Sequence, residues 1–219
     1  VYKRQVLGVF GVLVNGSPHK DGCTNMDLSI VSETLNKEGI DTEIFHIGVK
    51  PISGCIACRK CATLKKCAIE DCVNEFIEKA KTADGFVFGS PVYYASMNGA
   101  MSAFMDRAFY AGSNNAGMFR LKPAASVVNA RRGGNTATFD QMNRYFEICE
   151  MPVISSVYWN MTHGFTPEDV SKDLEGINTL KVLGRNMAYI LKCKEAGEKA
   201  GIVMPEAPEP DQTHPTPVS

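Results

Sequence analysis

Short apolar runs alternate with amphipathic segments along most of this chain, and this alternation restricts the possible fold more than any other feature. Five apolar runs have the length of buried strands: residues 6–14, 42–47, 85–90, 126–129 and 153–158. Segments with the apolar spacing of helices lie between and after them: residues 24–38, 72–82, 98–111, 135–149 and 168–199. Strands and helices that alternate in this way predict a parallel sheet with helices on both faces.

The strand count favours a flavodoxin-like, doubly wound α/β fold with five parallel strands in the order 2-1-3-4-5. We assign residues 1–200 to one such domain, since 219 residues are enough for a sizeable core. A cysteine-rich insertion at residues 55–72 follows the second strand within this domain. Five prolines occur in residues 205–219, so we expect a tail that is extended or disordered unless it lies along a partner subunit.

Charge and hydropathy argue against two classes of partner. The formal net charge is −1 and the longest basic clusters are pairs, so neither nucleic acid nor an anionic membrane surface is expected. No apolar run is long enough to span a membrane. Lys3-Arg4 and the run at 6–14 resemble an export signal, but NGSPHKDG follows in place of a small-residue cleavage site. We therefore expect the cytoplasm, where the eight cysteines would be thiols or metal ligands.

The loop after the first strand, NGSPHKDGCTN at 15–25, has the composition of a phosphate site. Gly16 and Gly22 permit tight turns, and Ser17 and Thr24 supply hydroxyls beside a helix N-terminus. The spacing is neither that of a P-loop nor that of a Gly-x-Gly-x-x-Gly dinucleotide fingerprint. Strand-to-helix turns that bind nothing can contain the same residues, so this loop alone does not decide.

The loop after the third strand begins the segment SPVYYASMNGAMSAFMDR, residues 90–107. Tyr93 and Tyr94 place aromatic surface at the carboxyl end of the strand, where a flat ring system could stack. They could equally do no more than cover the edge of the sheet. Ser96 or Asn98 is suited to cap the helix that follows.

The loop after the fourth strand belongs to NARRGGNTATF, residues 129–139. Gly133 and Gly134 let the backbone come close to a ligand, while Arg131 and Arg132 face either a polar ring edge or water. All three loops belong to one edge of the sheet, because parallel strands end on the same side. Together they predict a single ligand site at this edge.

Five of the eight cysteines lie in GCIACRKCATLKKCAIEDC, residues 54–72. Three successive cysteines at Cys-x2-Cys-x2-Cys spacing match the way bacterial ferredoxins surround an iron–sulfur cube, whereas zinc sites usually use two separated pairs or histidine. Cys67 would supply the fourth thiolate, and Cys72 is an alternative although it begins a predicted helix. Zinc, free thiols and a redox-active pair remain open as other interpretations.

The loop sequences resemble those of NAD(P)H-dependent FMN reductases with a flavodoxin-like fold, over residues 5–200. The cysteine stretch is similar to that of the iron–sulfur flavoprotein branch of this family. The resemblance implies FMN, with a [4Fe–4S] cluster on Cys55, Cys58, Cys61 and Cys67. It implies these residues at the flavin site: Ser17, His19, Cys23, Thr24, Pro91, Val92, Tyr93, Tyr94, Ser96, Asn98, Arg131, Arg132, Gly133 and Gly134.

Two positions depart from the family pattern. His19 and Cys23 stand where the family commonly has arginine and asparagine. A neutral histidine binds phosphate less strongly than a permanently charged arginine, and a thiol is a weak donor. We therefore expect FMN to be held less tightly than is usual in the family.

The resemblance also implies a reaction. FMN would accept hydride from NAD(P)H and electrons would pass through the cluster to a small-molecule or protein acceptor. Two other functions remain open: a non-enzymatic electron carrier between ferredoxin-like partners, and a cluster-free flavin, quinone or azo reductase. A homodimer or homotetramer is expected on the resemblance alone.

Overall fold

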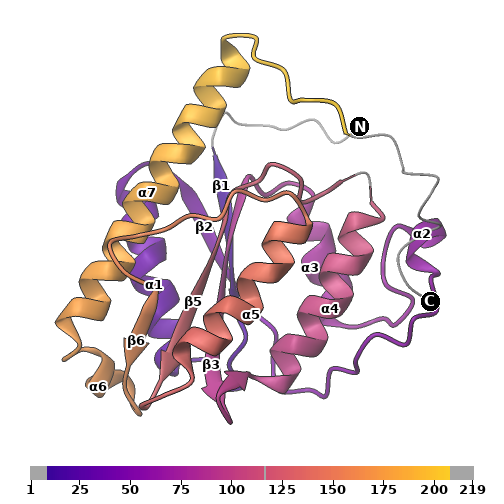
Figure 1. Ribbon diagram of the computed structural model, residues 1–219. Coiled ribbons are helices and arrows are strands. Elements are labelled where there is room, and N and C mark those ends of the chain that lie inside the picture. Colours follow the sequence, from indigo (N-terminus) through magenta and orange to yellow (C-terminus); the bar gives the residue numbers. More distant parts are fainter. Residues whose placement is uncertain (1–8, 116, 208–219) are drawn as a thin grey trace.

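The computed structural model describes residues 9–115 and 117–207 (Figure 1). The strands are β1 (Phe10–Asn15), β2 (Asp41–His46), β3 (Gly85–Tyr93), β4 (Ser96–Met97), β5 (Ala124–Ala130) and β6 (Met161–His163). The helices are α1 (Cys23–Lys37), α2 (Cys61–Leu64), α3 (Cys72–Ala80), α4 (Gly99–Ser113), α5 (Asn135–Ile148), α6 (Pro167–Val170) and α7 (Leu174–Lys199). Within these described ranges no helix is both long and apolar enough to cross a bilayer.

The sheet has the expected α/β architecture but one more strand than the sequence predicted. Its order is β2-β1-β3-β5-β6 with parallel pairing throughout, and β4 pairs antiparallel with the end of β3. The predicted order 2-1-3-4-5 is therefore corrected to 2-1-3-5-6 with β4 off the main path. A two-residue strand such as β4 has no periodicity that a sequence pattern could detect.

The last parallel strand was predicted in the wrong place. Residues 153–158 contribute only an isolated bridge between Val153 and Ala124, and the strand is β6 instead. Ser156 explains the difference, because its hydroxyl lies 2.6 Å from the Tyr158 carbonyl oxygen and 2.7 Å from the Asn160 side-chain oxygen and shares its one proton between them. Such local bonds form a turn that competes with a strand ladder.

Other boundaries also changed at the ends of the chain. Within the described residues the first strand begins at Phe10 and does not include Val9, while residues 6–8 of the predicted strand lie outside the described residues. The predicted helix at 168–199 is divided into α6 and α7, and the Asp173 side chain accepts from the Gly176 amide at the start of α7. Most of the proposed tail, residues 208–219, also lies outside the described ranges.

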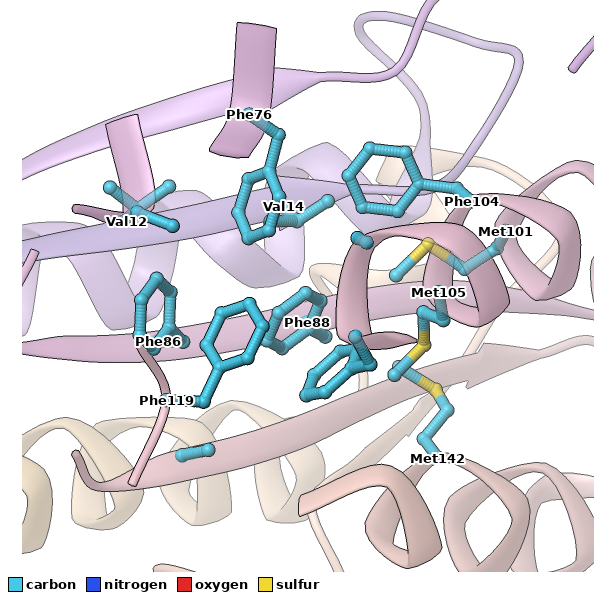
Figure 2. Close-up of a cluster of buried hydrophobic side chains, with 14 of the residues drawn as sticks. Val12, Val14, Phe76, Phe86, Phe88, Met101, Phe104, Met105, Phe119 and Met142 are labelled. Atoms are coloured by element: carbon cyan, nitrogen blue, oxygen red, sulfur yellow. The ribbon is translucent and has the colours of Figure 1, made fainter. Parts of the chain in front are cut away.

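An apolar core lies on each face of the sheet, between the strands and the helices that cover that face. Alternate strand residues point to opposite faces, so Val12, Val14, Phe86 and Phe88 join α3, α4 and α5 in one core. Residues of the other parity pack with α1 and α7 in the second core. Figure 2 shows the aromatic centre of the first core, where Phe76 lies between strand and helix side chains. This packing holds α3 and α4 in place beneath the cysteine segment.

Candidate functional site

A large cavity lies at the carboxyl ends of β1, β3 and β5, where the three loops were predicted to meet. Its volume is about 760 Å³, within the range typical of small-molecule sites. Its lining residues are Ser17, His19, Lys20, Asp21, Gly22, Cys23, Thr24, Pro91, Val92, Tyr93, Asn129, Ala130, Arg131, Gly164, Phe165, Thr166 and Pro167. The loop after β6 forms a wall that the sequence analysis missed, because β6 itself was misplaced.

The N-terminus of α1 opens onto this cavity with unsatisfied donors. Its N-cap residue is Gly22, and no side chain of the described part of the chain caps the helix. The Thr24 hydroxyl is buried at the cavity wall and has no hydrogen-bond partner among the described residues. A buried polar group left unpaired costs about 1–3 kcal/mol, which an anion accepting from it would offset. Free helix amides and an orphan hydroxyl therefore fit a phosphate group.

Side chains of the first loop set its shape rather than all facing the cavity. The Ser17 hydroxyl accepts from the His19 amide at 3.1 Å, and Asn15 accepts from the Ser17 amide at 3.0 Å. His46, at the end of β2, holds the Ser17 carbonyl through its ring nitrogen at 2.8 Å. Lys20, which the sequence analysis did not select, also lines the cavity and supplies a cation beside His19.

The loop after β3 is a tight hairpin. Tyr93 pairs with Ser96, so Tyr94 and Ala95 form a two-residue turn, and both have positive φ angles of 51° and 58°. Tyr94 is fully exposed and does not line the cavity. Ser96 instead donates to Gln141 at 2.9 Å, and the strand residues before the turn form the cavity wall.

Asn98 also lies away from the cavity. Its side chain accepts from the Ala100 amide at 2.8 Å and thereby caps α4. Of the loop after β5, Arg131 reaches the cavity whereas Arg132 and Gly133 are exposed elsewhere. Gly134 allows the loop after β5 to pack closely against the β3–β4 hairpin. Its φ is 96°, and a Cβ at this position would lie 2.6 Å from the Cα of Ala95.

A buried polar chain runs from the cavity into the protein. Asn129 lines the cavity and donates to the Thr162 hydroxyl at 2.8 Å, and that hydroxyl donates to the Asp27 carboxylate at 2.9 Å. Burial, opposed by the Thr162 hydrogen bond, raises the pKa of Asp27 to about 8. Asp27 therefore holds a proton over much of the range in which an ordinary aspartate is ionised.

Thr24→Val tests the phosphate assignment. A hydrogen bond to a charged group contributes about 1.5–3 kcal/mol, so the affinity for FMN should fall roughly ten- to hundredfold. The affinity for riboflavin, which has no phosphate, should stay unchanged. Flavin fluorescence quenching measures both affinities in parallel. Thr138→Val is the matched control, because its hydroxyl is also buried and unpartnered but does not line the cavity. Equal losses of riboflavin and FMN affinity would count against a phosphate at Thr24.

A second, small cavity brings together the cysteines that the spacing selected. Cys55, Cys58, Cys61 and Cys67 all line it, and Cys72 does not. Burial, with a smaller contribution from Asp71, raises the pKa of Cys72 to about 11 and keeps it protonated. Among the described residues no three Cys, His, Asp or Glu side chains stand in geometry for one metal ion. Four cysteine thiols around a common space are the donor set that a [4Fe–4S] cluster would use.

Three residues of the cysteine segment have left-handed backbone conformations. Ala57, Arg59 and Lys65 all have positive φ angles, of 51°, 57° and 56°. This conformation costs a residue other than glycine roughly 1–2 kcal/mol and is seldom adopted without compensation. Ala57 and Arg59 flank Cys58, which lines the small pocket with Cys55 and Cys61. Lys65 is the C-cap of α2, and its amide donates to the carbonyl of Cys61 at 2.9 Å.

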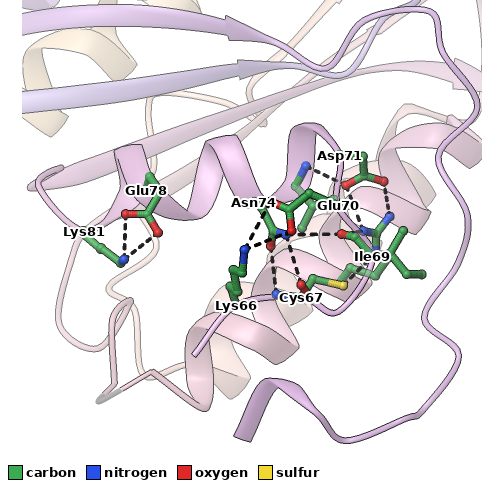
Figure 3. A network of polar contacts seen from close by, with 10 residues as sticks. Lys66, Cys67, Ile69, Glu70, Asp71, Asn74, Glu78 and Lys81 are labelled. Carbon is green, nitrogen blue, oxygen red and sulfur yellow. Dashed lines mark hydrogen bonds and ion pairs between the residues drawn. The ribbon is translucent and has the colours of Figure 1, made fainter. Parts of the chain in front are cut away.

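Two buried side chains from neighbouring helices hold Cys67. The Asn74 side chain accepts from the Cys67 amide at 2.9 Å and donates to its carbonyl at 3.0 Å (Figure 3). Arg107 of α4 donates from Nε to the Cys67 sulfur at 3.3 Å. Sequence patterns could not select either residue, because each looks like an ordinary polar position on a helix.

A family model described as NADPH-dependent FMN reductase matches residues 11–166, which contain the loops after β1, β3 and β5, the cysteine segment and all cavity-lining residues except Pro167. The chain belongs to this family. It is 32% identical to an iron-sulfur flavoprotein of Methanocaldococcus jannaschii over 82% of this chain and 95% of that protein. It is 26% identical to an iron-sulfur flavoprotein of Methanosarcina thermophila over 82% of this chain and 93% of that protein. The resemblance to the iron–sulfur flavoprotein branch is thus confirmed.

Solved structures agree on the fold. RosB, solved with 8-demethyl-8-formylriboflavin-5'-phosphate bound, superposes with a TM-score of 0.64 at 13% identity, over 96% of this chain and 94% of RosB. A WrbA-like flavodoxin of Agrobacterium tumefaciens gives a TM-score of 0.56 at 14% identity, over 85% and 98%. The flavodoxin-like α/β fold is confirmed, and the family makes the chain an FMN-dependent oxidoreductase flavoprotein.

Proposed function

We propose that this flavoprotein takes hydride from NAD(P)H into FMN and passes the electrons through a [4Fe–4S] cluster to an acceptor. The observation that carries the proposal is that one chain holds both a cavity suited to FMN and a separate pocket lined by four cysteines. Flavin reductases that use no cluster have no need of the second pocket. The iron-sulfur names of the relatives support the same interpretation.

The residues around the large cavity divide the work of holding FMN. The α1 N-terminus with Thr24 would hold the phosphate, and Lys20 would add positive charge at the rim, beside His19. Pro91 to Tyr93 form an apolar wall on which the ring system can pack. When bound, FMN would supply hydride acceptance and single-electron release, and the cluster would supply one-electron storage.

The loop after β6 forms a wall of the large cavity that suits the side on which a substrate would enter. Phe165 lines the cavity and is largely exposed, as is the side chain of Tyr94 on the neighbouring hairpin. Exposed aromatic surface beside a cofactor site supports a homodimer or homotetramer in which a second copy covers it. We also propose the cytoplasm, because none of the eight cysteines, all of which the structure describes, forms a disulfide.

The test is anaerobic purification followed by three measurements on one sample. We expect flavin absorption bands over a broad iron–sulfur background, about four irons and four sulfides per chain, and steady NAD(P)H oxidation with a dye acceptor. Flavin without iron would identify a cluster-free reductase. A cluster-bearing protein that exchanges electrons with a reduced redox protein but leaves NAD(P)H untouched would identify a carrier. A protein without flavin would contradict the proposal as a whole.

A further inference from the structure

Arg107 is a buried cation that neither the FMN site nor the four thiols explain. It is only 2% exposed and sits on α4 beneath the cysteine segment. All five of its N–H donors have acceptors: Nη1 and Nη2 bind Asp71 at 2.6 and 2.8 Å and the carbonyls of Ser53 and Ile69 at 3.3 and 3.0 Å. The remaining donor, Nε–H, points at the sulfur of Cys67.

Different nitrogens of the Arg107 guanidinium bind Asp71 and the sulfur of Cys67. The fork of the guanidinium is neutralised by Asp71, which also caps α3 by accepting from the Val73 amide. The Nε–H that remains is a charge-assisted donor held rigidly toward Cys67. The carbonyls of Ser53 and Ile69 lie on opposite sides of the four cysteines in the chain, so Arg107 ties both ends of the segment to α4.

We propose that Arg107 is a positioning residue for the iron–sulfur site, which presents Cys67 as the fourth thiolate and raises the reduction potential of the cluster through its Nε–H. This inference rests on the proposed cluster. Hydrogen bonds to cluster sulfurs stabilise the reduced, more negative state and therefore raise the potential. Without this hydrogen bond to the Cys67 thiolate, the added electron of the reduced cluster would be less stabilised.

Asn74 serves as an internal comparison, since it holds the same cysteine in a different way. It contacts the amide and the carbonyl of Cys67 but donates no hydrogen bond to its sulfur. A residue that only supports the loop, as Asn74 does, should affect how well iron is retained. A residue that donates to the sulfur should also move the potential of the cluster that is retained.

The experiment is a potentiometric titration of the anaerobic holoprotein followed by electron paramagnetic resonance, with iron, sulfide and flavin measured on each sample. The variants are Arg107→Lys, Asn74→Ala, and Arg107→Gln combined with Asp71→Asn. The double variant leaves no charge unpaired, and asparagine preserves the cap of α3. We expect it to lower the ratio of reduced to oxidised cluster about tenfold at a fixed potential, which is a shift of about 59 mV for one electron.

Arg107→Lys keeps the charge but loses the planar donor, so its potential should fall in the same direction by less. Asn74→Ala should lose iron while the remaining cluster keeps a ratio within about twofold of wild type. An unchanged ratio in the double variant, or equal shifts in the Asn74 and Arg107 variants, would overturn the inference alone. Complete loss of iron from all three variants alike would also overturn it, as a mark of general packing, because partial retention with a shifted potential is what the inference requires. A wild-type protein without iron and sulfide would overturn the cluster proposal and this inference together.

Discussion

Replacing Cys67 by alanine should abolish the iron–sulfur chromophore, whereas the same replacement at Cys72 should leave it intact. Cys67 lines the common pocket with Cys55, Cys58 and Cys61, and Cys72 lies at the start of α3 against the apolar core. Iron should fall from about four per chain to less than one in Cys67→Ala, because a cubane needs four thiolates. FMN content should stay constant, since the flavin cavity shares no residue with the cysteine pocket.

Iron, sulfide and flavin analysis of anaerobically purified variants measures this result. Cys72→Ala is the matched control, because it removes a thiol from the same segment without touching the pocket. Cys55→Ala, Cys58→Ala and Cys61→Ala should each behave as Cys67→Ala does. Loss of iron from Cys72→Ala with retention in Cys67→Ala would show that Cys72 is the fourth ligand and that the pocket geometry misleads.

Asp27→Asn should stabilise the protein increasingly as the pH rises from about 4 to 8. The pKa of Asp27 is raised in the fold to about 8 from an ordinary value of 3.8, chiefly by complete burial. The folded state therefore binds a proton that the unfolded state releases across this interval, and wild-type stability falls with pH. The slope is about 1.4 kcal/mol per pH unit for one fully linked proton.

Asparagine removes this penalty while it keeps a hydrogen-bonding partner for Thr162. The difference in free energy of unfolding between variant and wild type should be smallest near pH 4. It should then grow by about 1.4 kcal/mol for each pH unit up to about pH 8. Urea unfolding at pH 4.5, 6 and 8 measures it, with the exposed Asp140→Asn as the control. Parallel stability profiles for wild type and Asp27→Asn would refute a buried, protonated Asp27.

Much of the architecture could be predicted because its signals are local. The apolar run of β1 and the helical spacing along α1 appear within a few residues, and the loops that follow parallel strands must meet at one edge. Ser17, Thr24, Pro91 and Arg131 do lie around one cavity. Tyr94, Ser96, Asn98 and Gly134 do not, because a hairpin turn, a helix cap and a close backbone contact use them first.

The parts that sequence analysis missed depend on side-chain bonds and on tertiary placement, neither of which an apolar pattern records. The cavity wall after β6 was missed because Ser156 ends the expected strand through its own local bonds, and a three-residue strand leaves no periodic signal. Lys20 looks like any surface lysine until the sheet and helix place it at the cavity rim. Exposure of a charged residue cannot be read from its neighbours in sequence.

The sequence alone determined the class of fold, the edge of the sheet at which three loops line one cavity, and which cysteines have cluster spacing. These follow from periodicity, turn chemistry and ligand spacing, all of which act over short stretches of chain. Only the tertiary structure decided that Cys67 rather than Cys72 joins the pocket, that Arg107 contacts the Cys67 sulfur, and that Asp27 is buried beside Thr162. The reason is that the Arg107–Cys67 and Thr162–Asp27 contacts join residues 40 and 135 positions apart, and burial at such contacts is a property of packing.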